Sequence, residues 1–180
     1  LRNGEPIDLR KGAKTRISVA DIPGTAEEFS TSFKKLPQTV KKGMEIRLDD
    51  GSIILTVLKT GAGWVDCEVL IGGRLKEHKG INLPGAEIDL PALTVKDLKD
   101  LEMGLKVGID HVALSFVRSP DDILKARRII KAAGAPTRII AKIEHPLAVD
   151  HIDDILDAAD GIMIARGDLA VELSAAEVPA

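Results

Sequence analysis

Polar residues follow three short apolar runs in the C-terminal part of the sequence. Ser115 ends the run HVALS, Lys142 and Glu144 lie in IIAKIE, and Arg166 and Asp168 follow GIMIA. The carboxyl ends of the strands in a parallel α/β barrel converge on one face, where catalysis takes place. If these runs are such strands, a lysine and two carboxylates meet on that face. This set would suit a Mg²⁺-dependent site that handles phosphate.

Each of these residues also has an ordinary structural interpretation. Asp168, after Gly167, is typical of a helix N-cap or a turn. Glu144 fits a first-turn glutamate favoured by the helix dipole, and Lys142 fits a solvated strand end. A small polar residue such as Ser115 at a strand end usually serves packing or a local hydrogen bond. The functional prediction therefore depends on the set and not on any single residue.

From about residue 93 onward, the apolar spacing alternates between helical and strand-like. Thr94 with Asp97 resembles a capping box ahead of leucines at helical spacing. The runs IDHVALSF, TRIIAKI and GIMIA indicate buried strands, and single helices opening at Pro120 and at Pro146 are expected between them. This order is typical of a parallel sheet covered by helices. Because a closed eight-stranded barrel takes ~250 residues, the sequence predicts only part of one.

Residues 1–87 have the pattern of an all-β domain. IDLRKGAKTRISV alternates in the manner of strands and is interrupted at Gly12. The step Asp50-Gly51 between MEIRL and SIILTVL predicts a hairpin. Further glycines separate further short strands, which together indicate a small barrel or sandwich. The segment KGINLPGAEIDLPALT, rich in Gly and Pro, is predicted to be a hinge or crossover into residues 88–180.

Composition excludes several classes of protein. The 180 residues suffice for one medium domain or two small ones, and 44% hydrophobic with 29% charged residues is typical of a soluble protein. A net charge of −3 gives no electrostatic case for nucleic acid. No apolar run approaches the ~20 residues that span a membrane. The single cysteine, Cys67, cannot form an internal disulfide, so we expect a reducing, cytoplasmic location.

The segments KGINLPG, DLPALTVKDLKDL, SFVRSPDDI, IIAKIE and DGIMIARGDLAVEL occur in the order, and near the spacing, seen in pyruvate kinase. The chain resembles that family over essentially its whole length, least over residues 1–45. The resemblance implies an α/β fold. Residues 88–180 would form part of a TIM (β/α)₈ barrel, and residues 1–87 a small all-β, barrel-like lid domain. One departure is Ala170, which stands where the family's GDLG has its second glycine.

The resemblance also implies an activity, namely phosphoryl transfer from phosphoenolpyruvate to ADP with formation of pyruvate and ATP. Lys142 would steady the transferring phosphoryl group, and Glu144 and Asp168 would bind Mg²⁺. Lys79, together with an acidic residue of the hairpin turn, Asp50, would contact the nucleotide. The substrate would be bound by the backbone and side chains of Ser115, Ala165, Arg166, Gly167 and Asp168.

Further expectations concern assembly and completeness. The family commonly requires K⁺, whose ligands would lie largely outside these residues, and a homo-oligomer, a tetramer, is implied. Both ends of the sequence resemble the interior of a longer structure, so we expect the 180 residues by themselves to be inactive. Two other hypotheses stay open, a Mg²⁺-dependent lyase or aldolase with the same kind of barrel and a non-catalytic product with a stand-alone β module. The β domain and KGINLPG favour the kinase, since a lyase has no nucleotide to cover.

Overall fold

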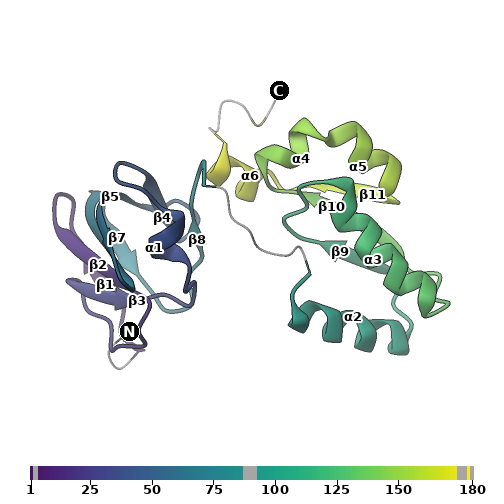
Figure 1. Cartoon of the computed structure of the whole chain (residues 1–180), viewed down its shortest axis with the longest axis horizontal. Helices are drawn as coiled ribbons and strands as arrows, with labels where there is room; N and C mark the ends of the chain where they lie inside the picture. The colour runs from purple at the N-terminus through teal and green to yellow at the C-terminus, as the bar shows by residue number, and fades with distance from the viewer. Residues whose placement is uncertain (2–3, 87–92, 174–177, 179–180) are drawn as a thin grey trace. The chain divides into compact units, whose positions relative to one another are not determined.

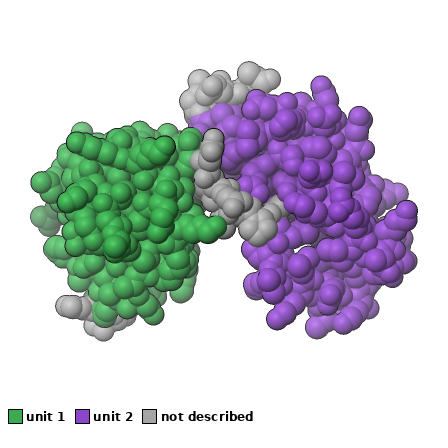
Figure 2. Space-filling view, in the orientation of Figure 1, with its two compact units in different colours: residues 1–88 green, residues 89–180 purple. Residues whose placement is uncertain are grey.

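The computed structural model describes residues 1, 4–86, 93–173 and 178 of the chain. The chain divides into two compact units, residues 1–88 and residues 89–180, each with its own core (Figures 1 and 2). The predicted boundary at residues 87 and 88 and the centre of the predicted hinge lie outside the described ranges. Within those ranges, no helix is both long and apolar enough to cross a membrane.

Unit 1 is a β-structure with a single short helix among its described residues. A six-stranded sheet has the order β3-β2-β6-β5-β4-β8, and β1 pairs with β7 in a separate antiparallel ladder. Alternate residues of β5 and β6 are buried, so that one sheet face supplies the core. The elements are β1 Ile7–Leu9, β2 Lys14–Ser18, β3 Glu28–Ser30, α1 Leu36–Thr39, β4 Glu45–Leu48, β5 Ile53–Gly61, β6 Trp64–Ile71, β7 Gly73–Leu75 and β8 Ile81–Asn82.

The predicted hairpin between β4 and β5 is confirmed. The Ser52 N–H donates to the Asp49 carbonyl at 3.0 Å, which closes a four-residue turn. Its two central residues, Asp50 and Gly51, have φ of 54° and 81°, as a type I′ turn requires. The elements β3, α1 and β8 were not predicted, because runs this short carry almost no periodicity.

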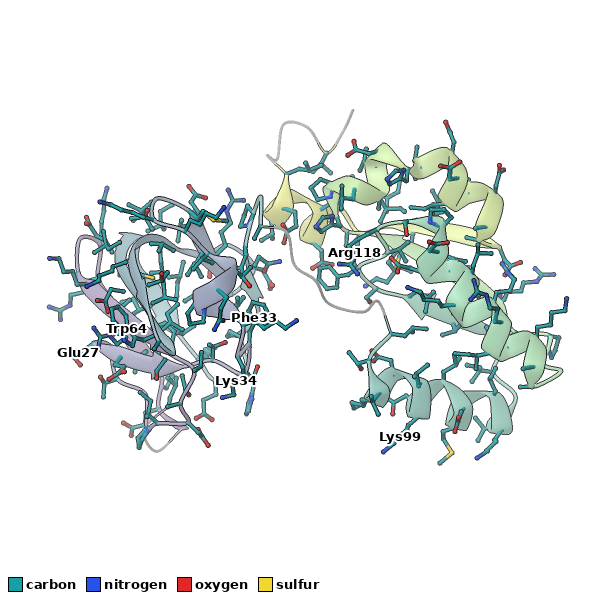
Figure 3. All side chains as sticks on the ribbon, in the orientation of Figure 1. Glu27, Phe33, Lys34, Trp64, Lys99 and Arg118 are labelled. Carbon is teal, nitrogen blue, oxygen red and sulfur yellow. The ribbon has the colours of Figure 1, made fainter. Side chains whose placement is uncertain are left out.

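Trp64, at the start of β6 (Figure 3), pairs with Gly61 of β5 on one side and with Ser18 of β2 on the other. A Cβ added to Gly61 would lie 2.2 Å from the indole, so a larger residue at this position would force the Trp64 side chain to move. The Arg16 guanidinium lies 4.1 Å from the ring centroid and forms an ion pair with Asp66. Cys67 lies in the core beneath, where burial raises the pKa of its thiol to about 12 and makes it unreactive.

Unit 2 alternates helices with three parallel strands, as the sequence predicted. The sheet has the order β11-β10-β9. Its helices and strands are α2 Val95–Val107, β9 His111–Leu114, α3 Pro120–Ala132, β10 Arg138–Ile143, α4 Pro146–Asp150, α5 Ile152–Ala158, β11 Gly161–Ile164 and α6 Arg166–Glu172. In β10, Ile139, Ala141 and Ile143 are buried in a core shared with α3 and α5. The alternation therefore places Lys142 on the opposite face of the sheet.

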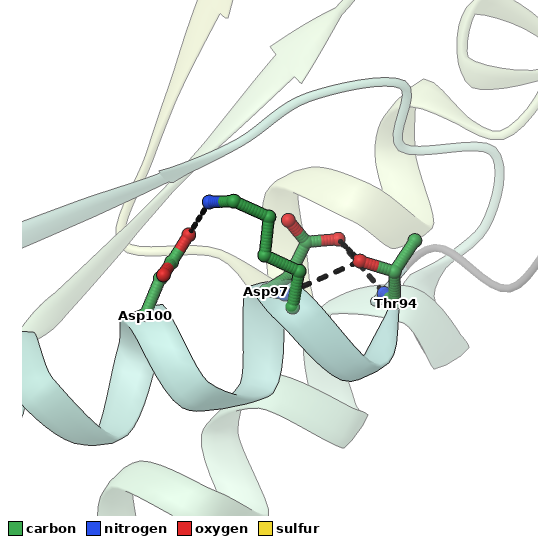
Figure 4. Close-up of polar contacts among 4 residues, drawn as sticks. Thr94, Asp97 and Asp100 are labelled. Carbon is green, nitrogen blue, oxygen red and sulfur yellow. Dashed lines mark hydrogen bonds and ion pairs between the residues drawn. The ribbon is translucent and has the colours of Figure 1, made fainter.

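The ends of the helices in unit 2 are set by local sequence. Thr94 Oγ1 accepts a hydrogen bond from the Asp97 N–H at 3.2 Å, and the Asp97 carboxylate accepts one from the Thr94 N–H at 2.8 Å (Figure 4). This reciprocal capping box begins α2, as predicted. Gly134, with φ of 64°, follows the last turn of α3.

Two details of the sequence-based prediction were wrong. The helix expected from Pro146 onward is two helices, α4 and α5, because His151 has φ of −109° and ψ of 24° between them. Both helices keep apolar residues at similar spacing, so periodicity alone cannot detect a break of one residue. The strands β9 and β11 were expected to be buried, but His111 and Ala113 in β9 and Met163 and Ile164 in β11 are exposed, since both are edge strands of this sheet.

Asp160 connects three elements at the amino end of β11. Its Oδ2 accepts hydrogen bonds from the Ile139 N–H at 2.7 Å and from Arg127 at 2.9 Å, and Arg127 also donates to the Ala158 carbonyl at 2.7 Å. The bond from Ile139, and then the charge of Arg127, hold the pKa of Asp160 below its usual range. The ionised carboxylate therefore stabilises the junction of β10, β11 and α3.

We predict that Asp160→Ala speeds amide hydrogen exchange at Ile139 by roughly fivefold to tenfold at neutral pH, since a charge-assisted bond of about 1–1.5 kcal/mol is lost. Asp160→Asn, which keeps an acceptor oxygen, should have a smaller effect.

Because the folded pKa of Asp160 is lowered, the stabilisation is present above the unfolded pKa of about 3.9 and is lost as the pH falls through the folded value. In the wild type, protection of the Ile139 amide should therefore fall as the pH falls through the folded pKa of Asp160. In Asp160→Asn, which has no titrating carboxyl at this position, that fall should be absent. Equal exchange in all three proteins would contradict the assignment.

Candidate active site

The strand register brings the three polar strand ends to one edge of the unit 2 sheet. Leu114 in β9 pairs with Ala141 in β10, and Ile143 in β10 pairs with Ile164 in β11. The Ala165 N–H then donates to the Ile143 carbonyl at 3.2 Å, which extends the ladder by one step. Ser115, Glu144 and Ala165 therefore leave the sheet at neighbouring positions, as expected for parallel strands.

Lys142 connects two of these strand ends through its ammonium group. Its Nζ forms an ion pair with Glu144 Oε1 and donates a hydrogen bond to Ser115 Oγ at 3.3 Å. Lys142 and Glu144 are two residues apart at the end of β10 and so project to the same side. The lysine side chain keeps 24% of its surface exposed, so the charge lies at the boundary between the protein and solvent.

Glu144 is a buried carboxylate with a hydrogen-bond donor for each oxygen. Its side chain is 1% exposed, Oε1 contacts Lys142, and Oε2 accepts a hydrogen bond from the Phe116 N–H at 2.8 Å. A buried charge is tolerated only when it is paired and hydrogen-bonded, and both conditions are met here. Each oxygen has a second lone pair, so a fixed carboxylate of this kind can still bind a cation.

The segment that follows β11 begins the short helix α6. Ala165 is its N-cap residue, and Arg166, Gly167 and Asp168 form the exposed first turn. The N–H groups of a first turn have no partner within the helix. A Cβ added to Gly167 would meet no atom within 4 Å, and its φ is not in the left-handed region, so neither packing nor backbone strain accounts for this glycine.

Asp168 does not join the Lys142 network. Within the described residues it forms no hydrogen bond or ion pair, and its side chain is exposed at the same edge of the sheet. Those residues also contain no group of three or more His, Cys, Asp or Glu side chains that could hold a metal. Mg²⁺ often binds through one or two carboxylates together with waters and substrate oxygens. Glu144 and Asp168 fit a cation bound in that manner and do not fit a cage made of protein ligands alone.

The two residues predicted to contact nucleotide, Lys79 and Asp50, lie in unit 1. Lys79 Nζ forms an ion pair with Asp49 Oδ1 at 2.8 Å, at the turn between β4 and β5. The hydrogen bond from Lys79 holds the pKa of Asp49 below its usual range, and the same contact raises the pKa of Lys79. Asp50 is exposed on the turn and adds a weaker attraction to Lys79.

Sequence reasoning missed two partners in these clusters. One is Asp49, the counterion of Lys79. The only sign of it in the sequence was the pair of adjacent aspartates, Asp49 and Asp50, in the turn. The other is the backbone of Phe116 as a donor to Glu144. Phe116 has a φ of 51°, and a left-handed backbone is uncommon for an aromatic residue, so no sequence pattern indicates it.

Comparisons with known proteins agree on one family. The family model described as "Pyruvate kinase, barrel domain" matches residues 1–180. The chain is 46% identical over 182 residues to a pyruvate kinase of Geobacillus stearothermophilus, covering 99% of the chain and 31% of that protein. It is 44% identical over 176 residues to a pyruvate kinase of Thermococcus litoralis, covering 98% of the chain and 37% of that protein. The chain thus spans about a third of the length of the curated relatives it matches.

We predict that Lys142→Met lowers the free energy of unfolding by about 2 kcal/mol, because it leaves the buried Glu144 with a single donor. This loss of free energy is smaller than that expected for a fully buried ion pair, because Lys142 is partly exposed. Adding Glu144→Gln to this variant should recover most of the loss, since the neutral amide still accepts from the Phe116 N–H. Denaturant unfolding of the two single variants and the double variant measures this coupling. If the two single effects simply add, the ion pair does not carry the stability assigned to it.

Proposed function

Since the chain belongs to the pyruvate kinase barrel-domain family, we propose that this protein transfers the phosphoryl group of phosphoenolpyruvate to ADP, giving pyruvate and ATP. One observation carries the proposal beyond the family match. The Lys142 ammonium is held at the strand ends between Ser115 and the buried Glu144. Phosphoryl transfer requires positioning and the neutralisation of charge more than covalent assistance, and a fixed ammonium supplies both.

Lys142 is the residue that would act on the phosphoryl group in transfer. An ammonium has three N–H donors, and the contacts with Ser115 and Glu144 use two of them. The third is available for an oxygen of the phosphoryl group. Because Ser115 and Glu144 fix the ammonium before substrate arrives, little reorganisation is needed in the transition state.

Glu144 and Asp168 are the residues that would hold Mg²⁺. When bound, the ion would offset the charge of substrate oxygens. Glu144 contributes an oxygen whose orientation is fixed by Lys142 and the Phe116 N–H, while Asp168 contributes one from the exposed first turn of α6. The open space around Gly167 supports binding of the substrate carboxylate by the backbone of Ala165 to Asp168. Ser115 and Arg166 would complete the substrate contacts.

The finer architecture follows from the same proposal. Residues 88–180 would form part of a TIM barrel, and the exposed apolar residues on the edge strand β11 are consistent with such a segment. Residues 1–87 would be a small lid domain whose Lys79 and Asp50 contact the nucleotide. K⁺ would be needed as well, with its ligands largely outside these residues. A tetrameric assembly and a cytoplasmic location belong to the same proposal.

We predict that Lys142→Ala and Lys79→Ala, made in a full-length protein that carries these residues, affect different kinetic constants. Loss of Lys142 should lower kcat by ~10² or more, as for removal of a preorganised donor. Loss of Lys79 should instead raise KM for ADP and leave phosphoenolpyruvate binding nearly unchanged. Steady-state kinetics and equilibrium binding of each ligand distinguish these effects, and Lys76→Ala, at an exposed lysine nearby, is the control. If Lys79→Ala abolished phosphoenolpyruvate binding and spared ADP, its assignment to nucleotide would be rejected.

The metal assignment generates a separate prediction. Glu144→Gln and Asp168→Asn should each raise the Mg²⁺ concentration that gives half-maximal activity by roughly tenfold or more, since each removes an anionic ligand from a cation with few protein ligands. Asp154→Asn, on the exposed surface of α5, serves as the control. The measurement is a Mg²⁺ titration of the full-length protein at saturating substrates. A midpoint unchanged in both variants would show that these carboxylates do not bind the metal.

A further inference from the structure

Phe116 combines two features that are unfavourable for an aromatic residue. Its φ of 51° lies in the left-handed region, where a side chain with a Cβ costs roughly 1–2 kcal/mol. Its side chain is also 48% exposed, so burial of the ring does not offset that cost. Backbone strain of this kind persists only where the surrounding structure determines the conformation. The contacts of residues 115–118 identify what determines it here.

Four consecutive residues are each held by a different contact. The Ser115 hydroxyl accepts from Lys142, the Phe116 N–H donates to Glu144, and Val117 is fully buried in the core of unit 2. The Arg118 N–H then donates to Asp122 Oδ2 at 3.0 Å, at the start of α3. The chain must therefore turn within one residue between the Lys142 network and the core. The left-handed conformation at Phe116 makes that turn.

The consequence for Glu144 is specific. A carboxylate held by one partner can rotate about its last side-chain bond, whereas donors on both oxygens fix the plane of the group. Lys142 supplies a charged donor on a long side chain, and the Phe116 N–H supplies a rigid one. The second lone pairs of both oxygens then point in defined directions. This matters for Mg²⁺, which tolerates little departure from octahedral geometry.

We propose that Phe116 is a positioning residue, whose left-handed backbone directs its N–H to Glu144 and thereby orients that carboxylate for the divalent cation. The part that concerns the cation rests on the proposed function. The backbone performs this role, and the aromatic ring is not required for it. Residues that adopt the left-handed conformation should therefore substitute for Phe116, and a β-branched residue should not.

The first experiment uses amide hydrogen exchange and needs no metal. Glu144→Ala should speed exchange of the Phe116 N–H by roughly tenfold or more, because that amide loses its acceptor. Phe116→Gly, Phe116→Asn and Phe116→Ala should keep a protected amide at position 116, whereas Phe116→Val should not. An unchanged Phe116 amide in Glu144→Ala would overturn the proposal, whatever the metal assignment.

The second experiment measures binding of Mn²⁺, as a substitute for Mg²⁺, by electron paramagnetic resonance in the absence of turnover. The Gly, Asn and Ala variants should bind within about threefold of the wild type, and Phe116→Val should bind roughly tenfold more weakly. In a Glu144→Gln background the Val substitution should have no further effect, because the two residues act through one contact. Equal weakening in all four variants would assign the effect to the ring and overturn the proposal. Unchanged binding in Glu144→Gln itself would instead refute the metal assignment in the proposed function.

Discussion

The burial of the Glu144 carboxylate is the constraint on which the edge of the unit 2 sheet depends. An ionised group with 1% exposure must have its donors in place, and here they come from two different parts of the chain. Lys142 reaches it along β10, and the Phe116 N–H reaches it from the loop between β9 and α3. The register of β9 against β10 cannot change without removing one of these donors. The same requirement explains why an aromatic residue accepts a left-handed backbone in that loop.

The two ends of the parallel sheet have different roles. At the amino end, Asp160 and Arg127 bond to each other and to the backbone, and so join β10, β11 and α3. At the carboxyl end, Lys142 has an unused donor, the Glu144 oxygens have unused lone pairs, and Asp168 is exposed. This division agrees with the proposal that ligands bind at the carboxyl ends of the strands. The contacts of these residues also distinguish the charged residues that stabilise the fold from those available to a ligand. The amino-acid types alone do not make this distinction.

Sequence patterns predicted the features that depend on near neighbours along the chain. The capping box of Thr94 and Asp97, the turn at Asp50-Gly51 and the strand at TRIIAKI each depend on a few adjacent residues, and all were correct. The convergence of strand ends was also predictable, because parallel strands separated by helices leave a sheet at one edge. The missed features depend on contacts distant in sequence or on a backbone that opposes residue preference. The ion pair of Lys79 with Asp49 and the donor at Phe116 are of that kind. The break at His151 was missed because the helices on both sides of it keep similar apolar spacing.

The ion pair between Lys79 and Asp49 has a consequence for ligand selectivity. The ammonium already has a counterion at 2.8 Å, so an anion that approaches it must displace that carboxylate or share the cation with it. A singly charged anion would gain little from this exchange, because it replaces one negative charge with another. A ligand with several charges would gain more, since it can interact with Lys79 while the repulsion from Asp49 and Asp50 is screened by a metal ion on its own phosphates. If Lys79 contacts a ligand as proposed, the pair with Asp49 would therefore favour a multiply charged, metal-bound anion over a monovalent one.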